Sequence, residues 1–331
     1  MKATNESGVV RLTRQGPPSA LEYVTEQVGM PKDHEVLIRH EAIALNFVDV
    51  LFRNGNFPLR QFPATIGVEA AGVVEAVGTG VKDWIAGDRI AYYFSLGAYA
   101  ERRLIDPQQL VKLPDDITFD QAASLLAKGL TARMLVKQAY PVQIGDVVLV
   151  HAAAGGVGSL VSRWAKSLGA TVIGTVGNAA KKALVQQHGL DLVVALDTED
   201  LAQQVNSITN GQGVDVAYDG VGKATFGKSV DLLKSGGTIV LFGNASGEPE
   251  IDSAYLHSKQ IKLIKPAIGQ YLPDRKSVDV ATAELFEAFR TGVLGTVEPA
   301  VYPLSQVAKA HQDLEASRTT GSVILHPLKS I

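Results

Sequence analysis

The segment that decides the fold runs from Val147 to Ser159 and reads Val-Val-Leu-Val-His-Ala-Ala-Ala-Gly-Gly-Val-Gly-Ser. The four leading apolar residues predict a short buried strand. The stretch Ser159–Leu168 predicts a helix with one apolar face, which Gly169 ends. A strand, a glycine-rich turn and a helix in this order are typical of the first βα unit of a dinucleotide-binding fold.

The turn itself fits the pattern G-x-G-x-x-G, with Ala153 in the first place. Gly155 in the second place lets the backbone approach a pyrophosphate, and Gly158 in the third lets the helix pack close to the strand. The helix N-terminus, with Gly156 and Val157, offers N–H groups and the positive end of the helix dipole. A tight β–α turn without a ligand is the alternative, but strand, turn, helix and next strand follow within about 30 residues, as the pattern requires.

The end of the next predicted strand, Thr171–Val176, indicates which dinucleotide binds. An NAD site usually has Asp or Glu there to bind the ribose 2′-hydroxyl. This chain has Gly177 and Asn178, with Lys181 and Lys182 following. A carboxylate would repel a 2′-phosphate and lysines attract it, so we expect NADPH. A solvated helix face is the alternative explanation of the paired lysines.

Strands and helices alternate regularly beyond Gly145, which predicts a parallel sheet buried on both faces. Six strands match a full doubly wound Rossmann sheet. The predicted strands are Val147–Val150, Thr171–Val176, Leu192–Leu196, Val214–Tyr218, Thr238–Phe242 and Ile261–Ile264. The predicted helices are Ser159–Leu168, Ala179–His188, Asp200–Thr209 and Ala224–Leu233.

The chain before about Pro114 has a different character, with short apolar segments such as Ala70–Val77 separated by Gly, Pro, Asn and Asp. This is typical of a β-rich domain; Val36–Ile38 and Arg89–Tyr93 are further strand candidates. Thr118 and Gln121 have capping-box spacing and predict a helix towards Tyr140. Gly129 interrupts this stretch, so two helices are the alternative.

After about Gln270 the alternation loosens. The helices Val280–Phe289 and Ser305–Ala316 and the strand Ser322–Leu325 are too few for a domain. We therefore expect two domains: a β-rich domain of residues 1–128 completed by 271–331, and a Rossmann domain of residues 129–270.

Composition excludes several classes of function. The 331 residues are 46% hydrophobic and 20% charged, with net charge −3 and few aromatic residues, which disfavours nucleic-acid and membrane surfaces. The chain has no cysteine, and therefore no disulfide, thiolate nucleophile or cysteine-based zinc site. No apolar run is long enough to span a bilayer, and the N-terminus does not read as a signal peptide, so we expect a cytoplasmic protein.

These features resemble the zinc-independent quinone oxidoreductases (zeta-crystallin-like) of the medium-chain dehydrogenase/reductase superfamily. The resemblance spans nearly the whole chain in family order. It implies a GroES-like catalytic domain into which the Rossmann domain is inserted. The matching stretches are Ala44–Asp49, Gly67–Gly72, Gly87–Arg89, Lys128–Thr131, His151–Gly158, Tyr218–Gly222 and Phe242–Gly247.

Zinc-dependent relatives carry Cys at the position of Asn46, a His-Glu pair at Val68-Glu69, and a cysteine-rich lobe that this chain lacks. Neither zinc site can be built. Without a metal, the alkoxide of an alcohol has no electrostatic stabiliser. Hydride delivery to an acceptor that is already electrophilic needs only orientation and modest hydrogen bonding.

The resemblance implies catalytic roles for Asn46, Asp49 and Lys128. Each has a structural alternative: Asn46 fixing a turn, Asp49 pairing with Arg53, and Lys128 as a solvated helix residue. The resemblance also implies that the cofactor contacts Asn46, Thr131, Gly155, Gly156, Val157, Gly158, Gly177, Asn178, Lys181, Phe242, Gly243, Asn244, Ser246, Lys265 and Arg318. We expect His151 to bond the backbone at the strand end.

Four positions depart from the family pattern. Leu51 and Phe57 stand where tyrosines are usual, so the acceptor pocket loses two hydroxyls and becomes more apolar. Leu196 replaces a Tyr near the 2′-phosphate, and Lys265 replaces a bidentate Arg by a point charge.

The leading hypothesis is a zinc-free, NADPH-dependent reductase of quinones or similar electrophilic carbonyl acceptors. The first alternative is reduction of activated C=C bonds in enones or enoyl-type substrates, which Leu51 and Phe57 favour. A second alternative, from another class, is an NADPH-sensing or RNA-binding protein without turnover. The apolar edge Ile261–Ile264 needs covering, which favours a homodimer through the Rossmann sheet.

Overall fold

The computed structural model describes residues 6–327, which divide into two compact units. Unit 1 comprises the residues up to Ala127 together with those from Val297 on, and unit 2 comprises Lys128–Thr296. The two units are described separately.

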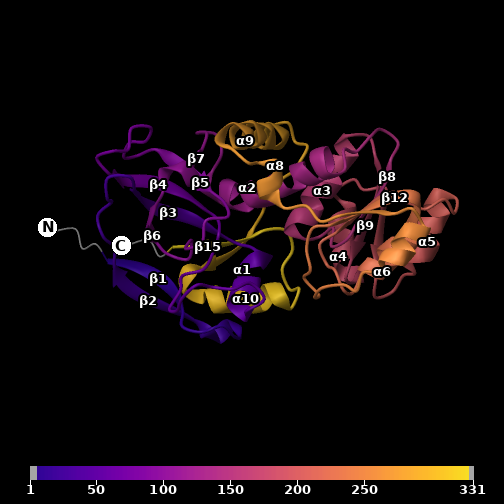
Figure 1. Ribbon diagram of the computed structural model, residues 1–331, viewed down its shortest axis with the longest axis horizontal. Coiled ribbons are helices and arrows are strands. Elements are labelled where there is room, and N and C mark those ends of the chain that lie inside the picture. Colours follow the sequence, from indigo (N-terminus) through magenta and orange to yellow (C-terminus); the bar gives the residue numbers. More distant parts are fainter. Residues whose placement is uncertain (1–5, 328–331) are drawn as a thin grey trace. The chain divides into compact units, whose positions relative to one another are not determined.

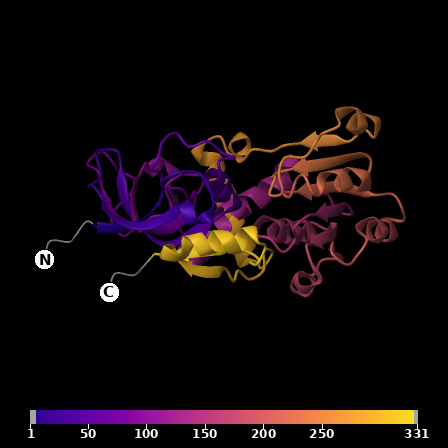
Figure 2. The same cartoon turned by 90° about the horizontal axis from the view of Figure 1, so that it is seen from below.

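Unit 2 is built on a six-stranded parallel sheet with the order β10-β9-β8-β11-β12-β13 (Figure 1). Its chain order reverses between β8 and β11, which marks the switch point where doubly wound folds bind ligands. Figure 2 shows β13 as the outermost strand. The strands are β8 (Val147–Val150), β9 (Thr171–Val176), β10 (Leu192–Ala195), β11 (Val214–Asp219), β12 (Leu233–Leu241) and β13 (Lys262–Ile264).

Both faces of this sheet are buried, as the near-continuous apolar strands predict. In β10, Val193 and Ala195 belong to one hydrophobic cluster and Val194 to another on the opposite face. Successive side chains of a strand point to opposite faces, so helices must cover both. The helices between the strands are α3 (Gly156–Ser167), α4 (Ala179–Gln186), α5 (Leu201–Thr209), α6 (Phe226–Leu232) and α7 (Ser253–Ser258).

A long helix, α2 (Phe119–Met134), precedes the sheet and ends in a π-helical turn, Leu135–Ala139. The expected capping box is present, since Thr118 and Gln121 exchange hydrogen bonds of 2.9 and 3.2 Å. The helix continues through Gly129, so the alternative of two helices was wrong. A Cβ on Gly129 would lie 2.3 Å from Leu285, so this glycine permits close helix packing and does not end the helix.

Leu285 belongs to α9 (Arg275–Arg290), which follows the short helix α8 (Ile268–Tyr271). The carboxylate of Glu284 in α9 bonds Arg133 at 2.7 Å and Lys137 at 3.1 Å. These contacts correct the domain boundary: residues 271–296 group with unit 2, because α9 packs on the end of α2.

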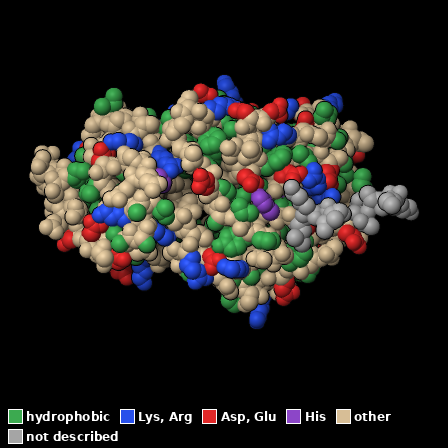
Figure 3. Space-filling model, turned by 180° about the vertical axis from the view of Figure 1, so that it is seen from behind, with side chains coloured by type: hydrophobic (Ala, Val, Ile, Leu, Met, Phe, Trp, Pro, Cys, Tyr) green, Lys and Arg blue, Asp and Glu red, His purple; other side chains and the backbone are tan. Residues whose placement is uncertain are grey.

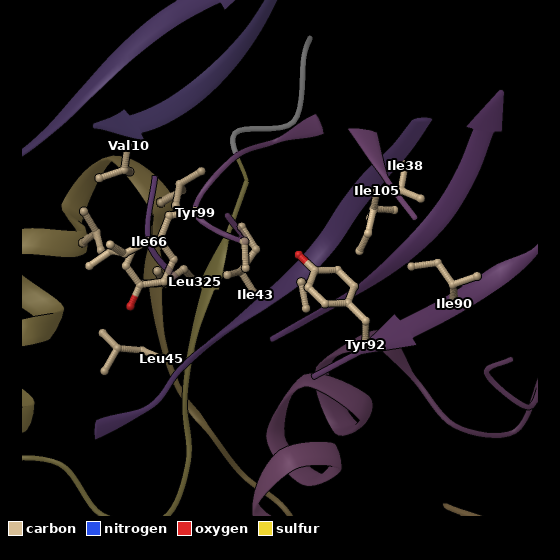
Figure 4. Close-up of a cluster of buried hydrophobic side chains, with 14 of the residues drawn as sticks. Val10, Ile38, Ile43, Leu45, Ile66, Ile90, Tyr92, Tyr99, Ile105 and Leu325 are labelled. Carbon is tan, nitrogen blue, oxygen red and sulfur yellow. The ribbon is translucent and has the colours of Figure 1, made fainter. Parts of the chain in front are cut away.

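Unit 1 contains a seven-stranded sheet ordered β14-β15-β3-β4-β5-β7, with β6 also pairing with β3, and a separate antiparallel pair β1-β2. Its core is drawn in Figure 4, where Ile43, Leu45 and Leu325 come from strands far apart in sequence. The strands are β1 (Glu6–Leu12), β2 (Leu21–Gln27), β3 (Val36–Leu45), β4 (Ala70–Val77), β5 (Arg89–Tyr92), β6 (Arg102–Ile105), β7 (Val111–Lys112), β14 (Ala300–Pro303) and β15 (Val323–His326).

The end of the chain completes this sheet, as expected for the tail. Strand β15 pairs antiparallel with Ile43–Leu45 of β3. Besides the first part of α2, unit 1 contains α1 (Phe47–Asn54), which was not expected from the sequence, and α10 (Val307–Glu315). Among residues 6–327, no helix combines the length and apolar character needed to cross a membrane.

Candidate functional site

The glycine-rich turn follows β8 directly and leads into α3. Ala152 adopts a left-handed backbone conformation with φ of 52°, and Gly155 is the N-cap of α3. A Cβ on Gly158 would lie 2.3 Å from the carbonyl oxygen of Ala152, so only glycine fits there. The first N–H groups of α3 have no partner within the helix and point out of its N-terminus. This cradle fits a phosphate group of a dinucleotide.

A buried hydrogen-bond network lies behind this turn. His151 bonds the hydroxyl of Thr175 through Nδ1 at 2.9 Å and that of Ser229 through Nε2 at 2.8 Å. We expected His151 to bond the backbone; its side chain instead joins β9 to α6. Burial lowers the pKa of His151, although the nearby Asp219 carboxylate opposes this shift.

Asp219 ends β11 and has no exposed surface. Its Oδ1 accepts the N–H groups of Val221 and Gly222 at 2.8 and 2.9 Å, and its carboxylate accepts the hydroxyls of Thr225 and Ser229. A buried charge is tolerated when hydrogen bonds replace its water. Asp219 therefore fixes the loop that follows β11.

The loop after β12 carries Phe242, Gly243, Asn244 and Ser246 and packs on the loop after β11. Ser246 donates from Oγ to the carbonyl of Val221 at 2.8 Å and accepts the N–H of Ala224 at 2.9 Å. A Cβ on Gly243 would lie 2.8 Å from the carbonyl of Gly220. The four predicted residues thus lie at the carboxyl end of the sheet, in a loop held against its neighbour.

The predicted 2′-phosphate residues follow β9. A Cβ on Gly177 would meet nothing within 4 Å, so space is open beside it. Asn178 caps α4 by accepting the N–H of Lys181 at 3.1 Å. Lys182 is held by both oxygens of Glu199 at 2.7 Å, whereas burial lowers the pKa of Lys181. Lys182 is therefore committed to a structural ion pair. Leu196, which lies shortly before Glu199 in the sequence, is 37% exposed.

In unit 1, Asn46 precedes α1 and bonds two carboxylates. Its backbone N–H donates to Asp49 at 2.9 Å, and its side-chain Nδ2 donates to Glu69 at 2.8 Å. Glu69 also accepts the N–H of Ala127 at 2.7 Å. Asp49 and Glu69 have no exposed surface. Asp49 therefore holds Asn46 in place and does not face the solvent.

A directed chain of hydrogen bonds continues from Asp49. The hydroxyl of Tyr99 lies 3.1 Å from Asp49 and 2.9 Å from Nε2 of His311. Arg53, which can only donate, lies 3.4 Å from Nδ1 of His311, so Nε2 carries the proton and Tyr99 donates to Asp49. Burial, with Arg53 beside it, lowers the pKa of His311 to about 3. Arg53 donates to both carboxylate oxygens of Glu315 at 2.7 Å. The structural alternative for Asp49 had named Asp49 as the partner of Arg53.

The other predicted residues occupy varied surroundings. Lys128 is buried, so its interpretation as a solvated helix residue was wrong, and Thr131 is half-buried. Leu51 is buried, whereas Phe57 is 38% exposed and packs edge-on against Phe52. Lys265 is exposed just after β13. Arg318 is held by Asp313 at 2.7 Å.

From the sequence alone, no role was expected for Glu69, Asp219 or His311. Two sequence signals could have indicated the buried carboxylates. Glu69 stands inside an apolar run, Val68-Glu69-Ala70, and Asp219 stands directly before a glycine at the end of a strand. His311 gave no such signal, because its partners are distant in sequence. Among residues 6–327, no group of three or more His, Cys, Asp and Glu side chains is placed to hold a metal ion.

Comparisons with known proteins agree with this arrangement. Residues 32–115 match the alcohol dehydrogenase GroES-like domain, and residues 156–284 match a family described as zinc-binding dehydrogenase. A GroES-like unit interrupted by a Rossmann unit defines the medium-chain dehydrogenase/reductase class, so the predicted fold is confirmed.

Similar proteins narrow the class. The quinone oxidoreductase of Pseudomonas aeruginosa is 39% identical over 96% of this chain and 99% of its own. The 2-haloacrylate reductase of a Burkholderia species is 37% identical over 95% of this chain and 97% of its own. The crystal structure of Escherichia coli quinone oxidoreductase complexed with NADPH has a TM-score of 0.93 and 37% identity, covering 97% of this chain and all of that one. The chain belongs to the quinone oxidoreductase family of the medium-chain dehydrogenases/reductases.

The crowding at Gly158 gives a stability prediction. Gly158→Ala pushes a Cβ against the Ala152 carbonyl, which belongs to the backbone and cannot rotate away. We expect a loss of about 1–3 kcal/mol in the free energy of unfolding, measured by urea denaturation. Gly177→Ala is the matched control, because its Cβ enters open space and should leave the unfolding curve unchanged. Equal stability of the two variants would contradict the close approach at Gly158.

Burial of His311 gives a pH prediction. Its pKa is about 3 in the folded protein and 6.5 ordinarily, so the unfolded chain binds more protons between these values. The free energy of unfolding therefore falls as the pH is lowered through this window, by up to about 1.4 kcal/mol per pH unit for one histidine. We expect His311→Gln to be less stable at pH 7 but to show a shallower slope between pH 6 and pH 4 in urea titrations. His257→Gln removes an exposed imidazole and is the control. If His311→Gln keeps the wild-type slope, His311 is not a neutral buried imidazole in the folded protein.

Proposed function

We propose that this protein is an NADPH-dependent reductase that transfers hydride to quinones or similar electrophilic carbonyl acceptors without a metal. The observation that carries the proposal is the phosphate cradle at Gly155–Gly158, at the switch point of the parallel sheet. Membership of the quinone oxidoreductase family supports it, as does the NADPH complex of the E. coli relative.

The residues present fit the dinucleotide. The N-terminus of α3, with Gly155, Gly156, Val157 and Gly158, would hold the pyrophosphate. NADPH, when bound, would supply the hydride. The loop with Phe242, Gly243, Asn244 and Ser246 would hold the nicotinamide ribose and carboxamide, and Thr131, Lys265 and Arg318 remain candidate cofactor contacts.

Preference for NADPH over NADH rests on the strand end after β9, where no carboxylate follows directly and space is open beside Gly177. Asn178 and Lys181 would meet the 2′-phosphate. A phosphate dianion stabilises the charged form of Lys181, whose pKa burial lowers in the free protein.

At the acceptor, we propose that Asn46 acts as an orienting donor and that Asp49 acts through it, because Asp49 is buried. Lys128 remains a candidate for the same region. Leu51 and Phe57, in place of tyrosines, leave the acceptor pocket apolar. The chain has no cysteine and carries Asn46 at the zinc-ligand position of its metal-dependent relatives, so the acceptor must itself be electrophilic.

Reduction of an activated C=C bond is the second candidate. It is favoured by the similarity to 2-haloacrylate reductase, which covers nearly the whole chain, and by the loss of two pocket hydroxyls. A binding role without turnover has weaker support: Lys and Arg side chains are interspersed with Asp and Glu over the described part of the face in Figure 3, with no stripe suited to RNA.

A homodimer through the Rossmann sheet is proposed on the basis of β13, which pairs with β12 along one edge and carries the half-buried Leu263 and Ile264. Its test is the molar mass by light scattering. The cytoplasmic location stays a prediction.

The function is tested by NADPH consumption with 1,4-benzoquinone, 9,10-phenanthrenequinone and a series of short enones, repeated with NADH. We expect faster turnover with the quinones and with NADPH. Turnover of the enones alone would establish the second candidate. Tight NADPH binding without oxidation by any acceptor would favour the binding role.

A lysine pair tests the cofactor preference. Lys181→Ala should weaken NADPH binding by about tenfold and leave NADH binding unchanged, since a charged contact to phosphate contributes about 1.5–3 kcal/mol. Lys182→Ala is the matched control, because Glu199 already holds that lysine, and it should change neither affinity by more than about twofold. Dissociation constants from nicotinamide fluorescence decide the matter. Equal weakening of NADPH and NADH by Lys181→Ala would place the 2′-phosphate elsewhere.

A further inference from the structure

The phosphate turn is held in place by side chains that would not touch a phosphate. His151, at its start, has 1% of its surface exposed, and the next residue, Ala152, adopts the left-handed conformation that non-glycine residues seldom take. A backbone in this region persists only where its surroundings over-determine it. The backbone of Ala152 also lies against Gly158, so its position sets the approach of α3 to the turn.

The two ring nitrogens of His151 are both engaged. The Ser229 hydroxyl lies 3.3 Å from Asp219 and 3.0 Å from the carbonyl of Thr225, and it has one proton to give to either oxygen. It therefore accepts from His151, so Nε2–H donates to Ser229 and Nδ1 accepts from Thr175. A neutral imidazole in one tautomer satisfies every partner.

The same network reaches the opposite side of the switch point. Asp219 holds the N–H groups of Val221 and Gly222, and Val221 in turn accepts the Ser246 hydroxyl of the loop after β12. The buried carboxylate of Asp219 thus connects three segments. It reaches the turn after β8 through Ser229 and His151, and it reaches the loops after β11 and β12 through the main chain of Val221 and Gly222.

We propose that His151 and Ser229 are positioning residues for the dinucleotide: they transmit the fixed geometry of Asp219 to the phosphate turn and so set the affinity for the pyrophosphate. The inference rests on the proposed cofactor, since it assigns the residues behind the site. Neither side chain contacts the ligand. Their effect is exerted through the backbone of Ala152 and the N–H groups at the start of α3.

Ser229→Ala and His151→Gln test the proposal. The first removes the acceptor of the imidazole within α6, and the second shortens the reach between Thr175 and Ser229. We expect the dissociation constant for NADPH to rise about tenfold in each, with less than a twofold change for adenosine 2′-monophosphate, which has the 2′-phosphate but no pyrophosphate. Fluorescence titration and competition provide the two constants. Thr209→Val, which removes a buried hydroxyl at the end of α5, is the control and should change neither.

The outcomes are distinct. Equal weakening of NADPH and adenosine 2′-monophosphate would show general loosening of the unit and overturn the positioning role, as would unchanged affinity for both. Wild-type protein that binds no NADPH would contradict the proposed function instead. If His151→Gln does not fold, Ser229→Ala alone decides, because alanine is compatible with the helix and the variant retains the His151 side chain while removing its hydrogen-bond acceptor.

Discussion

Within each unit, the candidate site residues are held by carboxylates that are buried completely and accept main-chain N–H groups. Asp49, Glu69 and Asp219 have no exposed surface, and each accepts N–H groups of a loop or helix end that carries candidate site residues. Transfer of a carboxylate out of water is costly unless hydrogen bonds replace the lost solvation. Each loop is therefore restricted to the conformation that supplies those bonds.

In unit 1 two of these carboxylates hold Asn46. The resemblance places a zinc-ligand cysteine at Asn46 and the glutamate of a His-Glu pair at Glu69. Here an amide donates to that glutamate at 2.8 Å, and the backbone of the same asparagine donates to Asp49. One main-chain and one side-chain hydrogen bond thus fix the position of Asn46.

The phosphate turn and the parallel sheet could be predicted from the sequence because their determinants are local. Glycine spacing, apolar strands and the Thr118–Gln121 capping box each lie within one element. The network around Asp49 could not be predicted, since Tyr99 and His311 are 212 residues apart and meet only when β15 and α10 return to unit 1. Gly129 shows the same limit: its sequence context indicates a helix break, whereas its partner Leu285 lies in α9.

The return of the chain to unit 1 also orders its biosynthesis. Strand β15 supplies the partner of Ile43–Leu45, so part of the long strand β3 lacks its neighbour until residues 323–326 have been made. All of unit 2 is translated before that point. On the ribosome, unit 2 can reach its final structure first, whereas unit 1 must wait for residues 323–326. During that interval the apolar side chains that β15 will cover stay without their partners, which exposes nascent unit 1 to non-native association.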